Sequence, residues 1–351
     1  MRPAPTPSGS RRSRRPRAVL AALALALVAV LAACSEPAPK PHPQKAADQA
    51  PVVVRTQLDR IVQEVAQALA AADQARNPEA LPGRADGAEL QIRQARYPVT
   101  ALDPAQPLPP PLGTERLVDV VPVDNPVEAH WPRFVLTVAK PTPDAAVPRI
   151  SVLTEASAHD PYKISASATV APGVTLPRTA PSETGVEPLP ADQPSGLAAT
   201  PADAVAWYAS VLTSGPESPH AQSFAEDKFA AAVLGESNAE RTAASVTCPG
   251  CFSYYVNHAP REGAIWSVRT EDGGAMVMSV LDSTRTFAVA TPGAKLPIPG
   301  DLSLLAGRNE ASQSAEIKSV EVVVLEVPKA GSQTPLRLLA ADRTPVAVTA
   351  S

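Results

Sequence analysis

The sequence contains little cysteine and little histidine. Three cysteines and five histidines occur among its 351 residues, and they do not form the paired clusters that structural zinc sites use. A Gly-x-Ser-x-Gly nucleophile elbow, a Walker-type glycine loop and a His-Glu-x-x-His metal helix are also missing. We therefore assign no catalytic residue, no metal ligand and no cofactor, and we favour a non-catalytic protein.

Proline, in contrast, is abundant. The chain carries 41 prolines, about 12% of its residues, against a usual share of about 5%. A hydrophobic content of 44% excludes a wholly disordered protein, whereas so many prolines exclude one continuous helical or tightly woven domain. The length predicts about two domains joined by irregular connections.

The first 33 residues have the pattern of an export signal. Residues 1–17 carry six arginines and no acid, and residues 18–33 are an uncharged run rich in Ala, Leu and Val. The run is short for a membrane span, which needs about 20 residues. We expect residues 1–33 to be a signal peptide, with the general secretory and twin-arginine export routes both open.

The next residues carry a specific motif. Leu31, Ala32, Ala33 and Cys34 together resemble a bacterial lipobox. The resemblance implies cleavage before Cys34, a diacylglyceryl group on its thiol and often an acylated amine, for example with palmitate. Each buried methylene contributes about 0.8 kcal/mol, so two or three acyl chains anchor firmly. The expected location is the extracytoplasmic face of the cell membrane; an ordinary secretory signal or an uncleaved anchor are the alternatives.

The net charge of the chain limits the partners that it can bind. The whole chain has a net charge of −4, and loss of the six N-terminal arginines leaves 25 basic against 35 acidic residues, about −10. Nucleic-acid phosphates and anionic lipid head groups repel such a surface. We therefore expect no nucleic-acid partner and a membrane contact made by the lipid anchor alone. The sequence does not identify a protein or envelope partner.

The mature chain divides into a stalk, two halves and a connection. Residues 34–51 are a Pro-rich stalk, extended at about 3 Å per residue. Residues 52–170 predict an α+β domain with a helical stripe over 54–72, which Asn77-Pro78 ends, and an antiparallel sheet. The expected strands are 90–97, 117–123, 134–139, 150–155 and 164–170.

The second half repeats this order. Residues 171–199 are a Pro-rich linker between domains or a strap across the first one, and residues 200–351 predict a second α+β domain. Thr200-Pro201 starts one helix and Ser218-Pro219 another, which Gly235 ends. The expected strands are 254–257, 264–270, 275–281, 286–290, 317–327 and 336–340, with a hairpin turn at Asp272-Gly273-Gly274.

The chain as a whole resembles actinobacterial lipoproteins of unknown function. The likeness lies in the Arg-rich signal, the lipobox, the high Ala and Pro content, and runs such as Trp131-Pro132-Arg133 and Trp207-Tyr208-Ala209. Helices followed by a curved antiparallel sheet also resemble the cone-shaped fold of nuclear-transport-factor-like and SnoaL-like domains. That resemblance implies two such domains, and the shared order leaves a duplication open.

One chemical constellation stands out, Cys248-Pro249-Gly250-Cys251. Pro-Gly is the preferred centre of a type II turn, which brings the flanking Cα atoms to disulfide distance. We predict a structural disulfide between Cys248 and Cys251, worth about 2 kcal/mol. A redox pair is one alternative, and a metal site with His258 as a third ligand is another.

Other residues give weaker signals. We interpret the scattered histidines as surface or loop residues and the three tryptophans as core anchors, with ligand stacking as the alternative for the tryptophans. These are His130, His159, His220 and His258, and Trp131, Trp207 and Trp266. The expected function is a lipid-anchored, non-catalytic binding or scaffold module of the cell envelope. The alternatives are an enzyme with a pocket in a cone-like domain and a thiol–disulfide protein.

Overall fold

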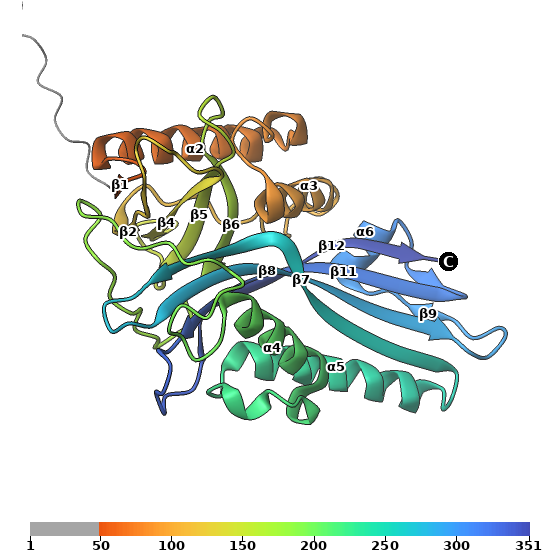
Figure 1. Cartoon of the computed structure of the whole chain (residues 1–351). Helices are drawn as coiled ribbons and strands as arrows, with labels where there is room; N and C mark the ends of the chain where they lie inside the picture. Colours follow the sequence, from red (N-terminus) through yellow and green to blue (C-terminus); the bar gives the residue numbers. More distant parts are fainter. Residues whose placement is uncertain (1–48) are drawn as a thin grey trace, which may run out of the picture. The chain divides into compact units, whose positions relative to one another are not determined.

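The computed structural model describes residues 49–351, which belong to one compact unit (Figure 1). The predicted signal peptide, the lipobox with Cys34, and all of the stalk before residue 49 lie outside the described residues.

Two four-stranded antiparallel sheets, each preceded by helices, make up the described part. The strands of the first sheet, in the order β2-β4-β5-β6, are Arg116–Val120, Arg133–Ala139, Arg149–Glu155 and Lys163–Thr169. Those of the second, in the order β12-β11-β8-β7, are Arg337–Ala350, Ser314–Val327, Ala275–Val289 and Phe252–Arg269. Short strand pairs join β1 (Ala50–Pro51) to β3 (Val123–Asp124) and β9 (Leu296–Pro297) to β10 (Glu310–Ala311). The predicted α+β class is confirmed.

The two sheets share one apolar core. Leu136 and Val152 of the first sheet lie in the same buried cluster as Met278 and Val322 of the second. On its other face the first sheet packs against α2 (Arg55–Ala75), and the second packs against α4 (Pro201–Ser214). The layers are therefore helix, sheet, sheet and helix, and the predicted halves 52–170 and 200–351 each supply one sheet.

The helices that begin each half follow from local sequence. In α2 most of the predicted stripe is buried, including Leu58, Val62 and Leu69, whereas Val54 is exposed, and the helix ends at Arg76 in the left-handed region, φ 47°. At the start of α4, Thr200 Oγ1 accepts a hydrogen bond from Asp203 N at 3.0 Å. Both helices are as predicted, because caps and an apolar stripe are encoded within a few residues.

The predicted strand over residues 90–97 is wrong. This segment belongs to helix α3 (Gly87–Leu102), whose buried face is largely polar and includes Glu89, Arg93 and Arg96. Arg93 is fully buried and donates to Glu89 Oε1 at 2.8 Å, to Asp73 and to Pro110 O at 3.0 Å. A hydrophobic period does not reveal a helix that buries ion pairs in place of apolar side chains.

The second helix of the C-terminal half begins and ends later than predicted. Single turns of 3₁₀ helix occupy Gly215–Glu217 and Ala221–Ser223, and α5 spans Lys228–Thr247. Asp227 caps it by accepting from Ala230 N at 2.7 Å. Gly235 lies inside the helix, because a helical glycine costs only about 1 kcal/mol relative to alanine.

Several predicted strands of the C-terminal half are parts of longer ones. Segments 254–257 and 264–270 lie mainly in β7, which has a register shift between Pro260 and Ile265. Segments 275–281 and 286–290 lie mainly in β8, and the turn between β7 and β8 at Asp272-Gly273 is the predicted hairpin. Helix α6 (Gly300–Ala306) was not expected.

The Pro-rich segment 171–199 contacts both sheets. Val186 exchanges backbone hydrogen bonds with the strand region at residues 121–123, and Leu189 N donates to Ser267 O at 2.9 Å. Farther along, Ala198 N donates to Pro328 O at 2.9 Å. The segment is therefore a strap that crosses both sheets, whereas the strap considered from the sequence crossed the first domain only.

The shared core yields the first prediction. Replacing Met278, which is fully buried, by alanine should cost about 2–5 kcal/mol and speed amide exchange in β4 and β5 as well as in β8. Hydrogen exchange followed by mass spectrometry measures this, with the exposed Val127→Ala as the control. Faster exchange confined to the second sheet would show that the two sheets unfold independently.

Candidate functional site

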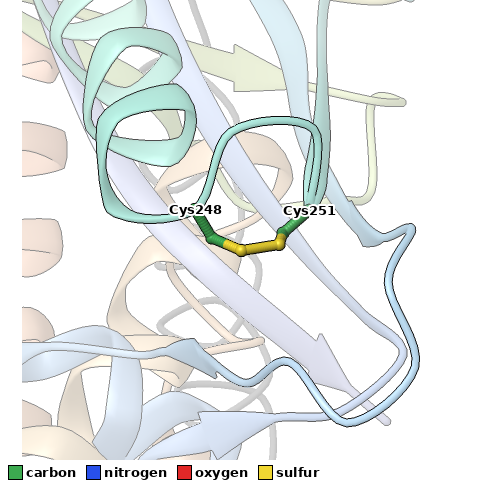
Figure 2. Close-up of a disulfide and its surroundings, with 2 residues drawn as sticks. All are labelled: Cys248 and Cys251. Carbon is green, nitrogen blue, oxygen red and sulfur yellow. A yellow bond between two sulfur atoms is a disulfide. The ribbon is translucent and has the colours of Figure 1, made fainter.

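The cysteine pair closes a turn at the junction of α5 and β7. Figure 2 shows the disulfide between Cys248 and Cys251, whose Cα atoms are 5.3 Å apart. Cys251 N donates to Cys248 O at 3.0 Å, and Gly250 has φ 74°, as the third position of a type II turn requires. The predicted pair and its turn are thus present, with the strand beginning at Phe252.

The surroundings of the pair do not resemble a redox site. Cys248 follows the C-terminal end of α5, where the helix dipole disfavours a thiolate, and Cys251 is 4% exposed. No group of three or more His, Cys, Asp or Glu residues that suits a metal ion occurs in residues 49–351 as far as they are described. His258 lies farther along β7 and has other partners, which are described below.

An apolar cavity of about 230 Å³ lies close to this turn. It is bounded by α5, by the face of the second sheet, and by the segment that runs from β9 into α6. Ten of its lining residues are apolar: Ala243, Phe252, Phe287, Leu296, Pro297, Ile298, Pro299, Leu302, Ala315 and Ile317. The eleventh is Glu240, so the cavity combines an apolar wall with one carboxylate.

Glu240 belongs to a balanced set of charges. Arg285 Nη1 donates to Glu240 and, at 2.6 Å, to Glu236 Oε1, and Glu236 in turn pairs with Arg343. Arg285 is 4% exposed, and burial lowers the pKa of Arg343. Two acids and two bases therefore offset one another, and the buried Arg285 is tolerated because it is paired.

Two hydroxyl groups lie beside Glu240. Ser237 Oγ, Tyr254 Oη and Glu240 Oε2 are all buried and lie together, since both neighbouring side chains act on the Tyr254 hydroxyl. Burial raises the pKa of Tyr254 to about 12; Ser237 acts against this rise and Glu240 adds to it. The Tyr254 hydroxyl therefore keeps its proton at neutral pH and is available as a donor.

The interpretation of His258 as a surface or loop residue is wrong. His258 is 6% exposed and lies on the face of β7 that α4 covers, where its Nε2 is 3.4 Å from Glu321 Oε1. Glu321, on β11, is completely buried, and neither of its oxygens has a hydrogen-bond partner among the described residues. The pair is therefore a carboxylate and an imidazole enclosed in a mainly apolar layer.

The hydrogen bonds of Thr213 fix the tautomer of His258. Thr213 Oγ1 donates its single hydrogen to Ala209 O at 2.9 Å, so it accepts from His258 N at 3.0 Å and from Nδ1 at 3.2 Å. Nδ1 thus carries a hydrogen, and a neutral ring would present its Nε2 lone pair to Glu321. Nε2 therefore faces the carboxylate of Glu321 across 3.4 Å.

Further hydroxyls occur on the helix-covered side of the second sheet. Ser279 Oγ and Ser319 Oγ are buried, and in the described residues they lack hydrogen-bond partners. Tyr208 of α4 donates to Asp227 at 3.1 Å; burial raises its pKa well above the usual value, and Asp227 and Glu321 add to the rise. This buried group of polar side chains was missed from the sequence. Its one local signal is Glu321 within the Val-rich strand 317–327.

The other histidines and the tryptophans are arranged differently. His130 is exposed and bonds Asp124 at 2.8 Å, and His159 is exposed. Trp207 packs against the α4 core cluster and stacks on His220, with ring centroids 4.7 Å apart. Trp266 packs against the core between the sheets, whereas Trp131 lies under the guanidinium of Arg133. Two of the three tryptophans are therefore core anchors.

None of the described helices is long and apolar enough to cross a membrane.

Comparison with known families gives one match. Residues 49–349 match the family model described as a domain of unknown function, DUF8094. The chain belongs to this family. The match covers nearly all of the described residues, so both sheets, the strap and the cavity lie within a single DUF8094 domain. No curated protein and no solved structure matches the chain.

The buried pair of this domain yields the second prediction. His258→Leu removes the partner of a buried carboxylate and should cost about 3–5 kcal/mol of unfolding free energy. Glu321→Gln should cost about 1 kcal/mol or less, because a neutral amide can donate to Nε2 and leaves no buried charge. Urea unfolding at pH 7 measures both, with the exposed His159→Leu as the control. Equal losses for the two variants would contradict the role of His258 as the partner of a buried carboxylate.

Proposed function

We propose that this DUF8094 protein is a lipid-anchored module on the extracytoplasmic face of the cell membrane, where it binds an apolar ligand without catalysing a reaction. The anchor is the acyl group expected on Cys34 within the lipobox Leu31-Ala32-Ala33-Cys34. The binding site is the cavity between α5, α6 and the second sheet. The single observation that carries the proposal is the lining of that cavity, ten apolar residues and one carboxylate.

The size and chemistry of the cavity support binding. Ligand sites are mostly apolar with a few placed polar groups, and an apolar cavity of about 150 Å³ already binds benzene. A cavity of about 230 Å³ therefore accommodates a segment of about eight carbons from an alkyl chain. A protein held at the membrane by acyl chains meets such chains at high local concentration.

The alternative functions have less support. A thiol–disulfide role needs an accessible, acidic thiol, whereas Cys251 is buried and Cys248 follows a helix C-terminus. An enzyme needs substrate access, whereas His258 and Glu321, a buried acid–base pair, are covered by the helical layer. We retain the enzyme as the second candidate because a buried pair of this kind also occurs in catalytic sites.

The likeness to cone-shaped domains is part of the proposal. Each half places helices before a four-stranded antiparallel meander, as a duplicated nuclear-transport-factor-like unit would. In the second half, α4 packs on one face of the sheet while the first sheet occupies the other. If the second half is a cone-shaped domain, the cavity beside α5 lies at the end of the second sheet that is remote from the strap.

The anchor is tested by the third prediction. When cells are grown with an alkyne-tagged fatty acid, the wild-type chain should take up the tag and Cys34→Ser should lose it, because the thiol accepts the diacylglyceryl group that carries the tagged chains. Cys251→Ser, which leaves Cys34 intact, should keep the tag. In-gel detection after hydroxylamine washing measures the outcome. A Cys34→Ser chain that stays fully labelled would overturn the anchor.

The cavity is tested by the fourth prediction. In isolated membranes that hold the full chain, a ten-carbon alcohol carrying a diazirine and an alkyne should label peptides within residues 296–317 after irradiation. Leu302→Trp fills the cavity and should abolish most of this labelling, and Ala315→Leu should reduce it. Val127→Trp, at an exposed site, is the matched control. Unchanged labelling in both cavity variants would overturn the binding function.

A further inference from the structure

The apolar cavity has a polar end, and its chemistry limits the ligand. Glu240 is the only charged one among the described residues of the lining, and its side chain is 22% exposed. Oε1 accepts from Arg285, and Oε2 is buried beside Tyr254. Each carboxylate oxygen has two lone pairs, so the oxygen that Arg285 holds can accept a second hydrogen bond.

The charged neighbours of Glu240 already balance its charge, so its carboxylate serves as a hydrogen-bond acceptor. Glu236 and Glu240 are balanced by Arg285 and Arg343, through pairs that are already formed. A second carboxylate brought into the cavity would meet Glu240, and burying an unpaired ammonium beside this balanced set would cost its hydration. A neutral group that donates one hydrogen bond incurs neither cost.

Two buried hydroxyl groups lie behind Glu240. Ser237 Oγ and Tyr254 Oη are buried beside it, and each can donate or accept. Both Ser237 and Glu240 interact with the Tyr254 hydroxyl, which holds the carboxylate in place as an acceptor. A ligand hydroxyl has one donor and two acceptor sites, so it matches this acceptor carboxylate.

We propose that the cavity binds a neutral amphiphile, an alkyl chain ending in a hydroxyl group, with the chain against Phe287, Leu302 and Ile317 and the hydroxyl donating to Glu240. This inference builds on the proposed function, since it requires that the cavity binds a ligand at all. It adds the class of ligand: long-chain alcohols or the hydroxyl end of a glycerolipid, in preference to fatty acids and alkylamines.

The fifth prediction compares three photoactivatable probes of equal chain length, an alcohol, a carboxylic acid and an amine, on membranes holding the full chain at pH 7.5. The alcohol should label residues 296–317 about tenfold more than the acid, because like charges oppose its entry. Glu240→Gln should bring the acid within about twofold of the alcohol. In this variant Arg285 and Arg343 share Glu236, so each keeps a partner, and the positive charge left in excess no longer opposes the acid.

Control experiments distinguish the proposed preference for a hydroxyl group from the proposed binding function. Glu271→Gln, an exposed glutamate in the β7–β8 turn, should leave the ratio between the probes unchanged. Equal labelling by all three probes, lost in Leu302→Trp, would overturn the hydroxyl preference while the binding function stands. A preference for the alcohol that persists in Glu240→Gln would also overturn it. Absence of cavity labelling by every probe would overturn the binding function itself.

Discussion

The apolar contact between the two sheets is the interaction on which the rest of the structure depends. Each sheet has two faces to cover, and α2 and α4 each pack on only one face of their sheet. The remaining faces cover one another through residues such as Leu136, Val152, Met278 and Val322. Neither sheet could leave that face in water without exposing a large apolar area. The stability of each half therefore depends on its contact with the other.

Ion pairs fasten the periphery of this core. Arg149 of β5 pairs with Asp342 of β12 at 2.6 Å, and Arg96 of α3 pairs with Asp301 of α6 at 3.0 Å. These contacts join segments about 200 residues apart in sequence. Because each charge is partly buried and paired, the pairs specify how the halves meet more than they add to the free energy of folding.

The second sheet carries two different environments on its helix-covered side. Towards α4 it holds the buried pair of His258 and Glu321, and towards α5 and α6 it borders the apolar cavity with Glu240 at its polar end. Both places combine a carboxylate with buried hydroxyl groups in an apolar setting. The difference is access, because Glu321 is completely buried whereas the side chain of Glu240 is 22% exposed. Access is what makes the cavity the better candidate for function.

The sequence by itself determined the features whose causes lie within a few residues. These are helix α2 with its apolar stripe, the Thr200 cap of α4, the hairpin at Asp272-Gly273 and the turn that brings Cys248 to Cys251. Only the tertiary structure decided the helix α3, the joining of the sheets, the pairing of His258 with Glu321 and the cavity. Each of these depends on partners distant in sequence: α3 is a helix with a polar buried face because Asp73 and Pro110 receive Arg93. Hydrophobic periodicity reports which residues avoid water, and it carries no information about which distant group will neutralise a charge.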